Sequence, residues 1–181
     1  MTRTVYYTAA TLDGFIADEQ DSLAWLFEQH DDPDRPSHYD EFIADVGALA
    51  MGATTYDWIT SDVRRTGGRW PYEQPTWVFT HRPLQPVVAD VSIVEGAVAD
   101  HLEAIRAAAA GRDVWVVGGG DLAGQFAEAG SLDRVVVSIA PVTLGAGRPL
   151  FPRRHDLRLA GVERNGDFVV ATYDVVGPRA D

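Results

Sequence analysis

The hydrophobic residues of the chain fall into short unbroken runs, separated by stretches in which apolar residues recur at helical spacing. Six runs have strand length, at 4–10, 46–52, 75–81, 91–96, 113–119 and 134–140, and most of them are rich in β-branched residues. Runs without polar alternation are typical of strands covered on both faces. Helical spacing occurs between several of them, at 37–45, 54–60, 99–111 and 121–130. This alternation predicts an α/β protein with a mostly parallel central sheet.

Two features refine this pattern. In the helix expected at 99–111, Asp100 is the predicted N-cap and Gly111 the predicted end. The acidic segment 18–37 contains two prolines and predicts a long loop after the first strand. Loops of that length in a compact domain are usually functional or mobile.

The C-terminal part changes to an antiparallel pattern. Two strand-like runs, 157–163 and 168–176, flank the sequence Arg164-Asn165-Gly166-Asp167. An Asn-Gly pair between such runs indicates a β-hairpin with a type I′ turn, whose two central residues both need positive φ. We therefore expect a C-terminal antiparallel hairpin to close the sheet.

Composition limits the possible functions. The 181 residues are 46% hydrophobic and carry no Pro/Gly/Ser-rich linker, which predicts one domain over 1–181. We expect a soluble, cytoplasmic protein, because no run of eighteen apolar residues occurs and the N-terminus lacks the apolar region of a signal peptide. The absence of cysteine excludes disulfides, thiolate nucleophiles and zinc–cysteine sites.

The charge of the chain narrows its partners. The formal net charge is -12, and all fifteen basic residues are arginines. An acidic chain is a poor binder of nucleic acid or of an anionic membrane surface, so neither is expected as a partner. The absence of lysine excludes Schiff-base chemistry and a P-loop lysine. A bound anion would be held by arginines and backbone amides.

Candidate chemistry lies in the turns that follow the strands, because ligands of parallel sheets bind beyond the carboxyl ends of the strands. The turns are TLDGFIAD, MGATTYDW, THRPL and GGGDLAG. The triple glycine at 118–120 does not match GxGxxG, and it indicates either a tight strand-to-helix turn or a phosphate site at a helix N-terminus. Thr54 and Thr55 are candidate N-caps or ligand contacts, and His81 with Arg82 indicates either a solvated loop or a phosphate contact.

Together with APVTLGAGRPLF at 140–151, these turns resemble the dihydrofolate reductase-like fold in order and spacing. The resemblance covers about 5–175 and is closest to the branch related to the reductase domain of bacterial riboflavin-biosynthesis deaminase-reductases. It implies a three-layer fold with helices on both faces of the sheet, NADPH as cofactor, no metal, and a cis peptide between Gly118 and Gly119.

The resemblance also implies a set of cofactor contacts. The diphosphate would be met by Gly52, Thr54 and Thr55, and by the glycine turn with Val117, Gly118, Gly119, Gly120, Asp121 and Leu122. The adenosine ribose would lie near Thr80, His81 and Arg82, and the nicotinamide carboxamide would contact Ala9 and Ile16. The chain departs from the family at Ala53, where an arginine is common. One contact to the 2′-phosphate is therefore missing, and Arg82 is the expected replacement.

The substrate side is less well defined by the resemblance. Folate reductases carry a carboxylate on the helix after the long loop, and Asp40 is the first candidate here, followed by Asp13 and Glu28. The alternative for each is a solvated surface acid. We expect Trp25 to close over the substrate ring and Ser138 to line the pocket, with ordinary packing as the alternative.

The leading functional prediction is an NADPH-dependent oxidoreductase that transfers a hydride to a C=N or C=O bond of a pterin-like or pyrimidine-like heterocycle. The HxE and PCxxC zinc signature of nucleobase deaminases is absent, so deamination is not expected. The alternative is a non-catalytic nicotinamide-nucleotide-binding or sensor protein on the same fold.

The sequence further predicts a homodimer. The segment 140–151 is apolar and poor in charge, and such a surface must be covered by a partner or by the chain's own core. The prediction rests on this segment together with the C-terminal hairpin. For the related riboflavin-pathway reductases, the resemblance implies a dimer packed through this side of the sheet.

Overall fold

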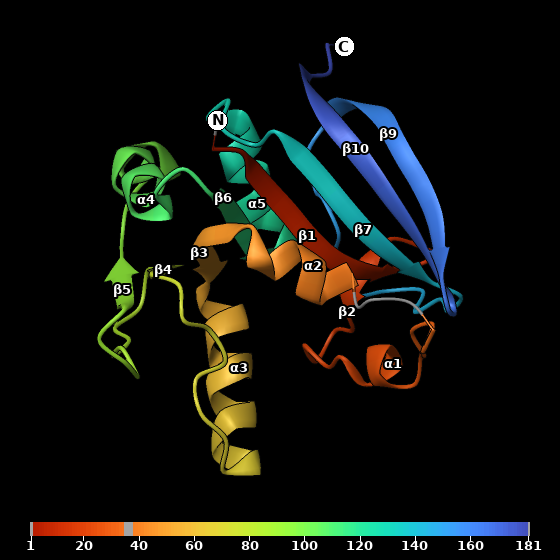
Figure 1. The fold of residues 1–181 in the computed structure, drawn as a ribbon, viewed down its shortest axis with the longest axis horizontal. Helices are drawn as coiled ribbons and strands as arrows, with labels where there is room; N and C mark the ends of the chain where they lie inside the picture. Colours follow the sequence, from red (N-terminus) through yellow and green to blue (C-terminus); the bar gives the residue numbers. More distant parts are fainter. Residues whose placement is uncertain (1, 35–37, 181) are drawn as a thin grey trace.

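The centre of the molecule is an eight-stranded sheet with the strand order β5-β4-β3-β6-β1-β7-β10-β9 (Figure 1). The structure is a computed structural model and describes residues 2–34 and 38–180. The strands are β1 (Thr4–Thr11), β3 (Val46–Gly52), β4 (Thr76–Phe79), β5 (Val91–Val94), β6 (Asp113–Gly118), β7 (Arg134–Ala140), β9 (His155–Asn165) and β10 (Phe168–Pro178). All neighbouring pairs from β5 to β7 are parallel, whereas β7–β10 and β10–β9 are antiparallel. This confirms the predicted mostly parallel sheet with a C-terminal antiparallel hairpin.

Helices cover both faces of the sheet. The buried cluster on one face contains side chains of α4 (Leu102–Ala109) and α5 (Gly120–Glu128), among them Ile105 and Phe126. The cluster on the other face contains Ile59 of α3 (Ala53–Thr66), with Phe42 of α2 (His38–Ala44) packed against it. In Figure 1, α2 lies in front of the sheet and α5 behind it. The predicted three-layer α/β architecture is therefore confirmed, and it explains why six of the seven residues of β3 are buried.

A small second sheet was not expected from the sequence. Strand β2 (Phe15–Ala17) pairs antiparallel with β8 (Arg148–Pro149), and the short helix α1 (Ala24–Phe27) follows β2. The predicted long loop at 18–37 thus contains one helical turn, and its residues 35–37 lie outside the described part of the chain. The pairing joins two segments that are far apart in the sequence, so local patterns do not reveal it.

Three local predictions need correction. The N-cap of α4 is His101, because Asp100 ends the preceding 3-10 turn η1 (Val98–Asp100) and accepts a hydrogen bond from the amide of Ala97. The helix ends before Ala110, which already has a left-handed conformation, and not at Gly111. In the hairpin, Asn165 pairs with Phe168, so the central turn residues are Gly166 and Asp167.

Only the glycine of these two turn residues has positive φ, which is the pattern of a type II′ turn and not of type I′.

The segment 140–151 packs on its own chain. Leu144 lies against the cluster that contains Trp25, and Leu150 and Phe151 lie against the main core. The segment is thus partly covered by its own chain, while several of its residues stay exposed, and the homodimer remains a prediction.

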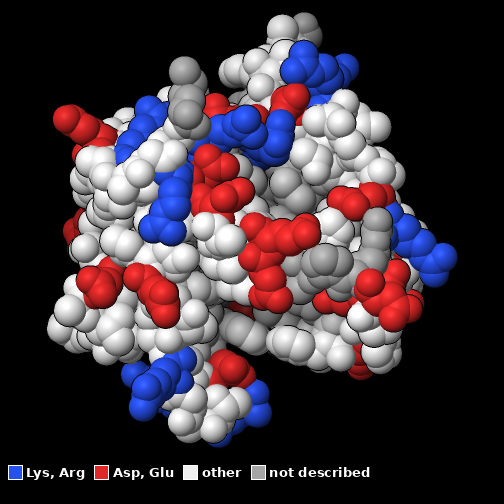
Figure 2. All heavy atoms as spheres, viewed as in Figure 1, with Lys and Arg blue, Asp and Glu red and all other residues white. Residues whose placement is uncertain are grey.

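The surface carries charges of both signs. Figure 2 shows acidic and basic side chains interspersed over the viewed face, with acidic groups gathered over its middle. None of the helices in the described residues combines the length and the apolar character needed to cross a membrane.

Candidate functional site

A cavity of about 1020 Å³ lies at the carboxyl ends of the parallel strands. Its walls include residues at or just after the ends of β3, β4 and β6, residues within β1 and β7, and parts of β2, β8 and α1. This is the position at which open α/β sheets bind ligands. Of the residues selected from the sequence, it brings together Ala9, Ile16, Gly52, Thr54, Thr55, Thr80, His81, Val117, Gly118, Gly119, Gly120, Asp121, Leu122 and Ser138.

Two helix N-termini form one wall of the cavity. Helix α5 begins after Gly119 and α3 begins after Gly52, and neither N-cap makes a side-chain capping hydrogen bond. The peptide between Gly118 and Gly119 is cis, as the resemblance implies. The first amides of an uncapped helix are unsatisfied donors at the positive end of the helix dipole, so this wall suits a diphosphate.

The two turns lie next to each other, and the contact is tight on the side of Gly118. A Cβ atom on Gly52 would lie 3.8 Å from the carbonyl oxygen of Gly118, and one on Gly118 would lie 3.2 Å from Thr55 Oγ1. A Cβ on Gly119 would meet only Ile16 Cδ1, at 3.7 Å. The side of Gly119 on which a side chain would project therefore faces the cavity wall formed by β2. This glycine-lined cradle fits the diphosphate of a nicotinamide nucleotide.

The opposite end of this wall contains Thr80 and His81. Thr80 is buried, and its Oγ1 accepts a hydrogen bond from the Arg82 amide at 3.0 Å. Arg82 itself does not line the cavity, because its guanidinium forms an ion pair with Asp57 of α3. Both side chains of the pair are about half exposed, so the pair lies at the rim of the adenosine end. A 2′-phosphate would have to share this guanidinium with Asp57.

The third wall, next to β1 and β7, is built by Tyr7, Ala9 and Ser138. Ala9 and Ser138 are direct neighbours in the parallel register, and Tyr7 lies two residues before Ala9, on the same face of β1. Burial raises the pKa of Tyr7 to about 12. A hydrogen bond with Ser138 lowers this pKa, and the negative charge of Asp31 raises it further. Tyr7 is therefore a neutral hydroxyl at neutral pH.

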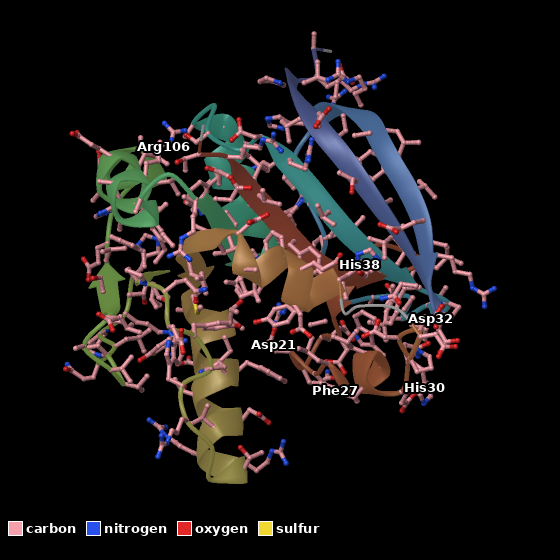
Figure 3. All side chains as sticks on the ribbon, in the orientation of Figure 1. Asp21, Phe27, His30, Asp32, His38 and Arg106 are labelled. Carbon is pink, nitrogen blue, oxygen red and sulfur yellow. The ribbon has the colours of Figure 1, made fainter. Side chains whose placement is uncertain are left out.

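Aromatic side chains complete this end of the cavity. The Trp115 indole nitrogen donates a hydrogen bond to the carbonyl oxygen of Tyr7 at 3.0 Å, and the Tyr72 ring meets Trp115 edge-on at 5.6 Å. Phe27 of α1 and Trp58 of α3 stack with ring centroids 6.1 Å apart. Figure 3 shows Phe27 on the side of α1 that faces α3. Flat aromatic walls of this kind suit a planar heterocycle.

The structure does not bring the predicted acidic candidates to the cavity. Asp40 is exposed on α2 and Glu28 caps the end of α1, and neither lines the cavity. The carboxylate of Asp13 accepts hydrogen bonds from Thr11 Oγ1 at 2.6 Å and from the Gly145 amide at 2.7 Å. These bonds, that of Thr11 first, lower the pKa of Asp13 and give it a structural role in the turn after β1.

Trp25 also lies elsewhere than expected. It is buried among Ala140, Phe168 and Val170 behind the wall and does not line the cavity. Its position supports the alternative of ordinary packing.

Three other carboxylates do line the cavity. Asp21 holds Arg148 through two contacts, Oδ1 to Nε at 2.6 Å and Oδ2 to Nη2 at 3.1 Å. Asp121 accepts hydrogen bonds from Gln125 and Arg153, which lower its pKa. Asp31 lies near Tyr7 at the aromatic end. Sequence reasoning selected only Asp121 of these three.

Some of the cavity-lining residues that sequence reasoning missed could have been found from their spacing to selected residues. Tyr7 and Trp115 each precede a selected strand residue, Ala9 or Val117, by two positions and share its face. Trp58 lies four residues after Thr54 on α3, again on the same face. Asp31 and Phe27 had no such signal, because they lie in the loop region whose position depends on tertiary contacts.

The chain matches a known protein family over almost its whole length. The model of the RibD C-terminal domain matches residues 4–171. The Bacillus subtilis protein YwjB is 32% identical over 176 residues, which cover 94% of this chain and 97% of YwjB. YyaP of the same organism is 25% identical and covers 82% of this chain and 80% of its own.

Solved structures show the same fold. A protein crystallised from Shewanella sp. PV-4 has a TM-score of 0.81 at 24% identity, covering 97% of this chain and 99% of its own. A pyrimidine reductase-like protein of Corynebacterium diphtheriae has a TM-score of 0.65 at 15% identity, covering 97% of this chain and 92% of its own. A diaminohydroxyphosphoribosylaminopyrimidine deaminase/5-amino-6-(5-phosphoribosylamino)uracil reductase of Thermotoga maritima has a TM-score of 0.62 at 16% identity, covering 97% of this chain and 57% of its own. By the family match and the identity to YwjB, the chain belongs to the RibD C-terminal domain family.

Proposed function

We propose that this chain is an NADPH-dependent reductase that transfers a hydride to a C=N or C=O bond of a pterin-like or pyrimidine-like heterocycle. The observation that carries the proposal is that one continuous cavity joins two uncapped helix N-termini to a slot walled by aromatic rings. Membership of a family of reductase domains supports it. The name of the Thermotoga maritima protein supports the pyrimidine class of substrate.

Different residues of the chain would bind the cofactor and orient the substrate. The amides after Gly52 and Gly119 would hold the diphosphate, and the groups around Ala9 would hold the carboxamide of the nicotinamide, which supplies the hydride. The wall formed by Trp115, Tyr72 and the Phe27–Trp58 stack would orient the substrate ring and exclude water.

The polar groups at the aromatic end set the orientation of the substrate. Tyr7 stays protonated at neutral pH, since its pKa is raised to about 12, and it can donate a hydrogen bond to a ring oxygen or nitrogen. Asp31 can accept a hydrogen bond from a ring N–H group. This assignment replaces Asp40 by Asp31 as the substrate carboxylate.

Titration of the purified protein with NADPH, followed by nicotinamide fluorescence, tests the cofactor. Oxidation of bound NADPH in the presence of dihydrofolate, dihydropterin or aminouracil derivatives tests the reaction. Turnover with one of these ring classes supports the proposal. Binding without turnover supports a nicotinamide-nucleotide sensor, and absence of NADPH binding contradicts both functions.

Arg82→Ala should weaken NADPH binding by about tenfold and leave NADH binding nearly unchanged. The reason is that a charge-assisted contact between a guanidinium and a 2′-phosphate stabilises a complex by about 1.5 kcal/mol or more. We expect a loss of binding free energy near this lower limit, because Asp57 already pairs with the guanidinium. Fluorescence titration of both cofactors measures it, with Arg65→Ala, at the far end of α3, as control. An equal loss for NADPH and NADH would remove Arg82 from this role.

We also propose that the chain forms a homodimer through the C-terminal hairpin. Leu159 and Val162 on the edge strand β9 are 57% and 60% exposed, and Val176 on β10 is 65% exposed. Large apolar side chains exposed together on one hairpin are normally covered. Light scattering should give twice the chain mass of 19.7 kDa. Leu159→Glu should then yield monomers, while Leu12→Glu, at an exposed leucine outside the hairpin, should not. A wild-type mass near that of one chain would contradict the dimer.

A further inference from the structure

The turn between β9 and β10 makes a second set of contacts that the hairpin does not need. Asn165 is buried, and its Nδ2 donates a hydrogen bond to Asp31 Oδ1 at 2.8 Å, while its Oδ1 accepts one from the Asp32 amide at 3.0 Å. The carboxylate of Asp167 accepts a hydrogen bond from the His30 amide at 2.9 Å, and the Asp167 amide donates to the His30 carbonyl at 2.9 Å. Figure 3 shows His30 and Asp32 at the turn end of β9 and β10.

The backbones of the turn and of the loop are in direct contact at Gly166. This residue has φ of +57°, and a Cβ atom on it would lie 2.1 Å from the carbonyl oxygen of His30 and 2.8 Å from the Asp32 amide nitrogen. A side chain at this position would therefore push residues 30–32 away from the hairpin. We call the turn residues Asn165, Gly166 and Asp167 the hairpin clamp.

The loop that the clamp holds reaches the cavity. Gln29 and Asp31 line it, and so does Phe168, the first residue of β10 after the clamp. Asn165 occupies one carboxylate oxygen of Asp31, and no residue in the described part of the chain donates a hydrogen bond to the other oxygen, Oδ2. Asp31 is also close enough to the half-buried Tyr7 for its charge to act on that hydroxyl. The clamp thus holds an exposed carboxylate that lines both this cavity and a smaller neighbouring one, and one of its oxygens accepts no hydrogen bond from the described residues.

We propose that the hairpin clamp positions Asp31 to recognise ring N–H donors of the substrate, with Asn165 as the positioning residue. The proposal rests on the function proposed above and narrows its substrate class to planar heterocycles that carry at least one N–H group in the ring. A carboxylate held by a buried amide keeps a fixed direction, so a donor on a ring stacked in the aromatic slot can meet Oδ2 without ordering a loose loop.

The decisive variant is Asn165→Asp. It keeps the size of the side chain and both turn residues, but it replaces the amide donor by a second carboxylate facing Asp31. Like charges at hydrogen-bond distance repel, so the loop should leave the clamp while the hairpin persists. Gln85→Glu is the matched control, because it makes the same amide-to-carboxylate change at an exposed loop residue.

A second pair of variants tests the clamp by shape. Gly166→Ala introduces the Cβ that collides with the His30 carbonyl, and Gly130→Ala introduces alanine at the same kind of positive φ, +63°, with no atom within 4 Å. The control separates the backbone cost of alanine from displacement of the loop. Hydrogen exchange of residues 30–32 should rise in Asn165→Asp and Gly166→Ala and stay unchanged in both controls.

The functional probe is aminouracil, compared with its N,N′-dimethyl derivative, which lacks ring N–H donors. Calorimetry in the presence of NADP⁺ should show that the wild type binds aminouracil about tenfold more tightly than the dimethyl compound. Asp31→Asn, Asn165→Asp and Gly166→Ala should lose this preference, and both controls should keep it. NADPH affinity should stay within about twofold in every variant, because the cradle lies at the other end of the cavity.

Two results would overturn the proposal. One is a wild type without preference for ring N–H donors. The other is an Asn165→Asp variant that keeps the preference although exchange shows its loop released. Failure of the proposed function itself is distinguishable, because it appears in the NADPH titration of the wild type and does not involve the clamp.

Discussion

Gly119→Ala should weaken NADPH binding by about a hundredfold while changing the free energy of unfolding by less than about 1 kcal/mol. The added Cβ would meet only Ile16 Cδ1, at 3.7 Å, so the protein itself has room for it. The same atom would project from the glycine turn toward the cavity wall formed by β2, where a bound diphosphate would approach bare backbone. The methyl group therefore acts on the ligand and not on the fold.

Fluorescence titration with NADPH and denaturant unfolding measure the two quantities. Gly161→Ala in β9 is the matched control, because no atom lies within 4 Å of its Cβ position and it is far from the cavity. It should leave both quantities unchanged. Wild-type affinity in Gly119→Ala would show that the glycine turn serves only the fold.

Gly120→Ala, one residue further on, should instead lower the stability of the fold. Its Cβ would lie 2.3 Å from the carbonyl oxygens of both Pro149 and Leu150, which belong to the segment around β8. These are backbone atoms, so the N-terminus of α5 and β8 would have to move apart. Overpacking of this kind costs about 1–3 kcal/mol or more.

Thermal unfolding followed by circular dichroism should show a midpoint several degrees lower for Gly120→Ala than for the wild type. Gly119→Ala serves as its control, because both variants add the same atom to the same turn. An unchanged midpoint would mean that β8 is not packed on α5 as the structure shows. The two variants together separate the functional part of the triple glycine from its structural part.

The sequence by itself determined the elements of the central sheet and the end of it at which ligands bind. The runs at 46–52 and 134–140 coincide with β3 and β7, because a short apolar run without polar alternation is typical of a strand covered on both faces. The turns after the strands could be ranked for chemistry because the carboxyl ends of parallel strands meet at one edge. For that reason most of the expected cofactor contacts line one cavity.

Element ends were less well determined. Asp100 is a residue type favoured at N-caps, yet it ends a 3-10 turn two residues before α4 begins. The hairpin was predicted at the right place but with the wrong turn type. The sequence took Asn165 and Gly166 as the central residues, whereas the pairing of β9 with β10 makes Gly166 and Asp167 central. Capping and turn residues fix a position only to within a residue when a neighbouring strand or turn competes for the same groups.

Only the tertiary structure decided the substrate side. Asp40 and Trp25 were chosen by their place along the chain, but one lies on the solvent side of α2 and the other behind the wall. Asp31 reaches the cavity because the hairpin clamp holds its loop, through contacts between residues more than a hundred positions apart. Periodicity records which face of an element is buried, and it carries no information on where a loop without periodicity is held. The side chains that would select the substrate were therefore placed by long-range hydrogen bonds, which local sequence patterns do not encode.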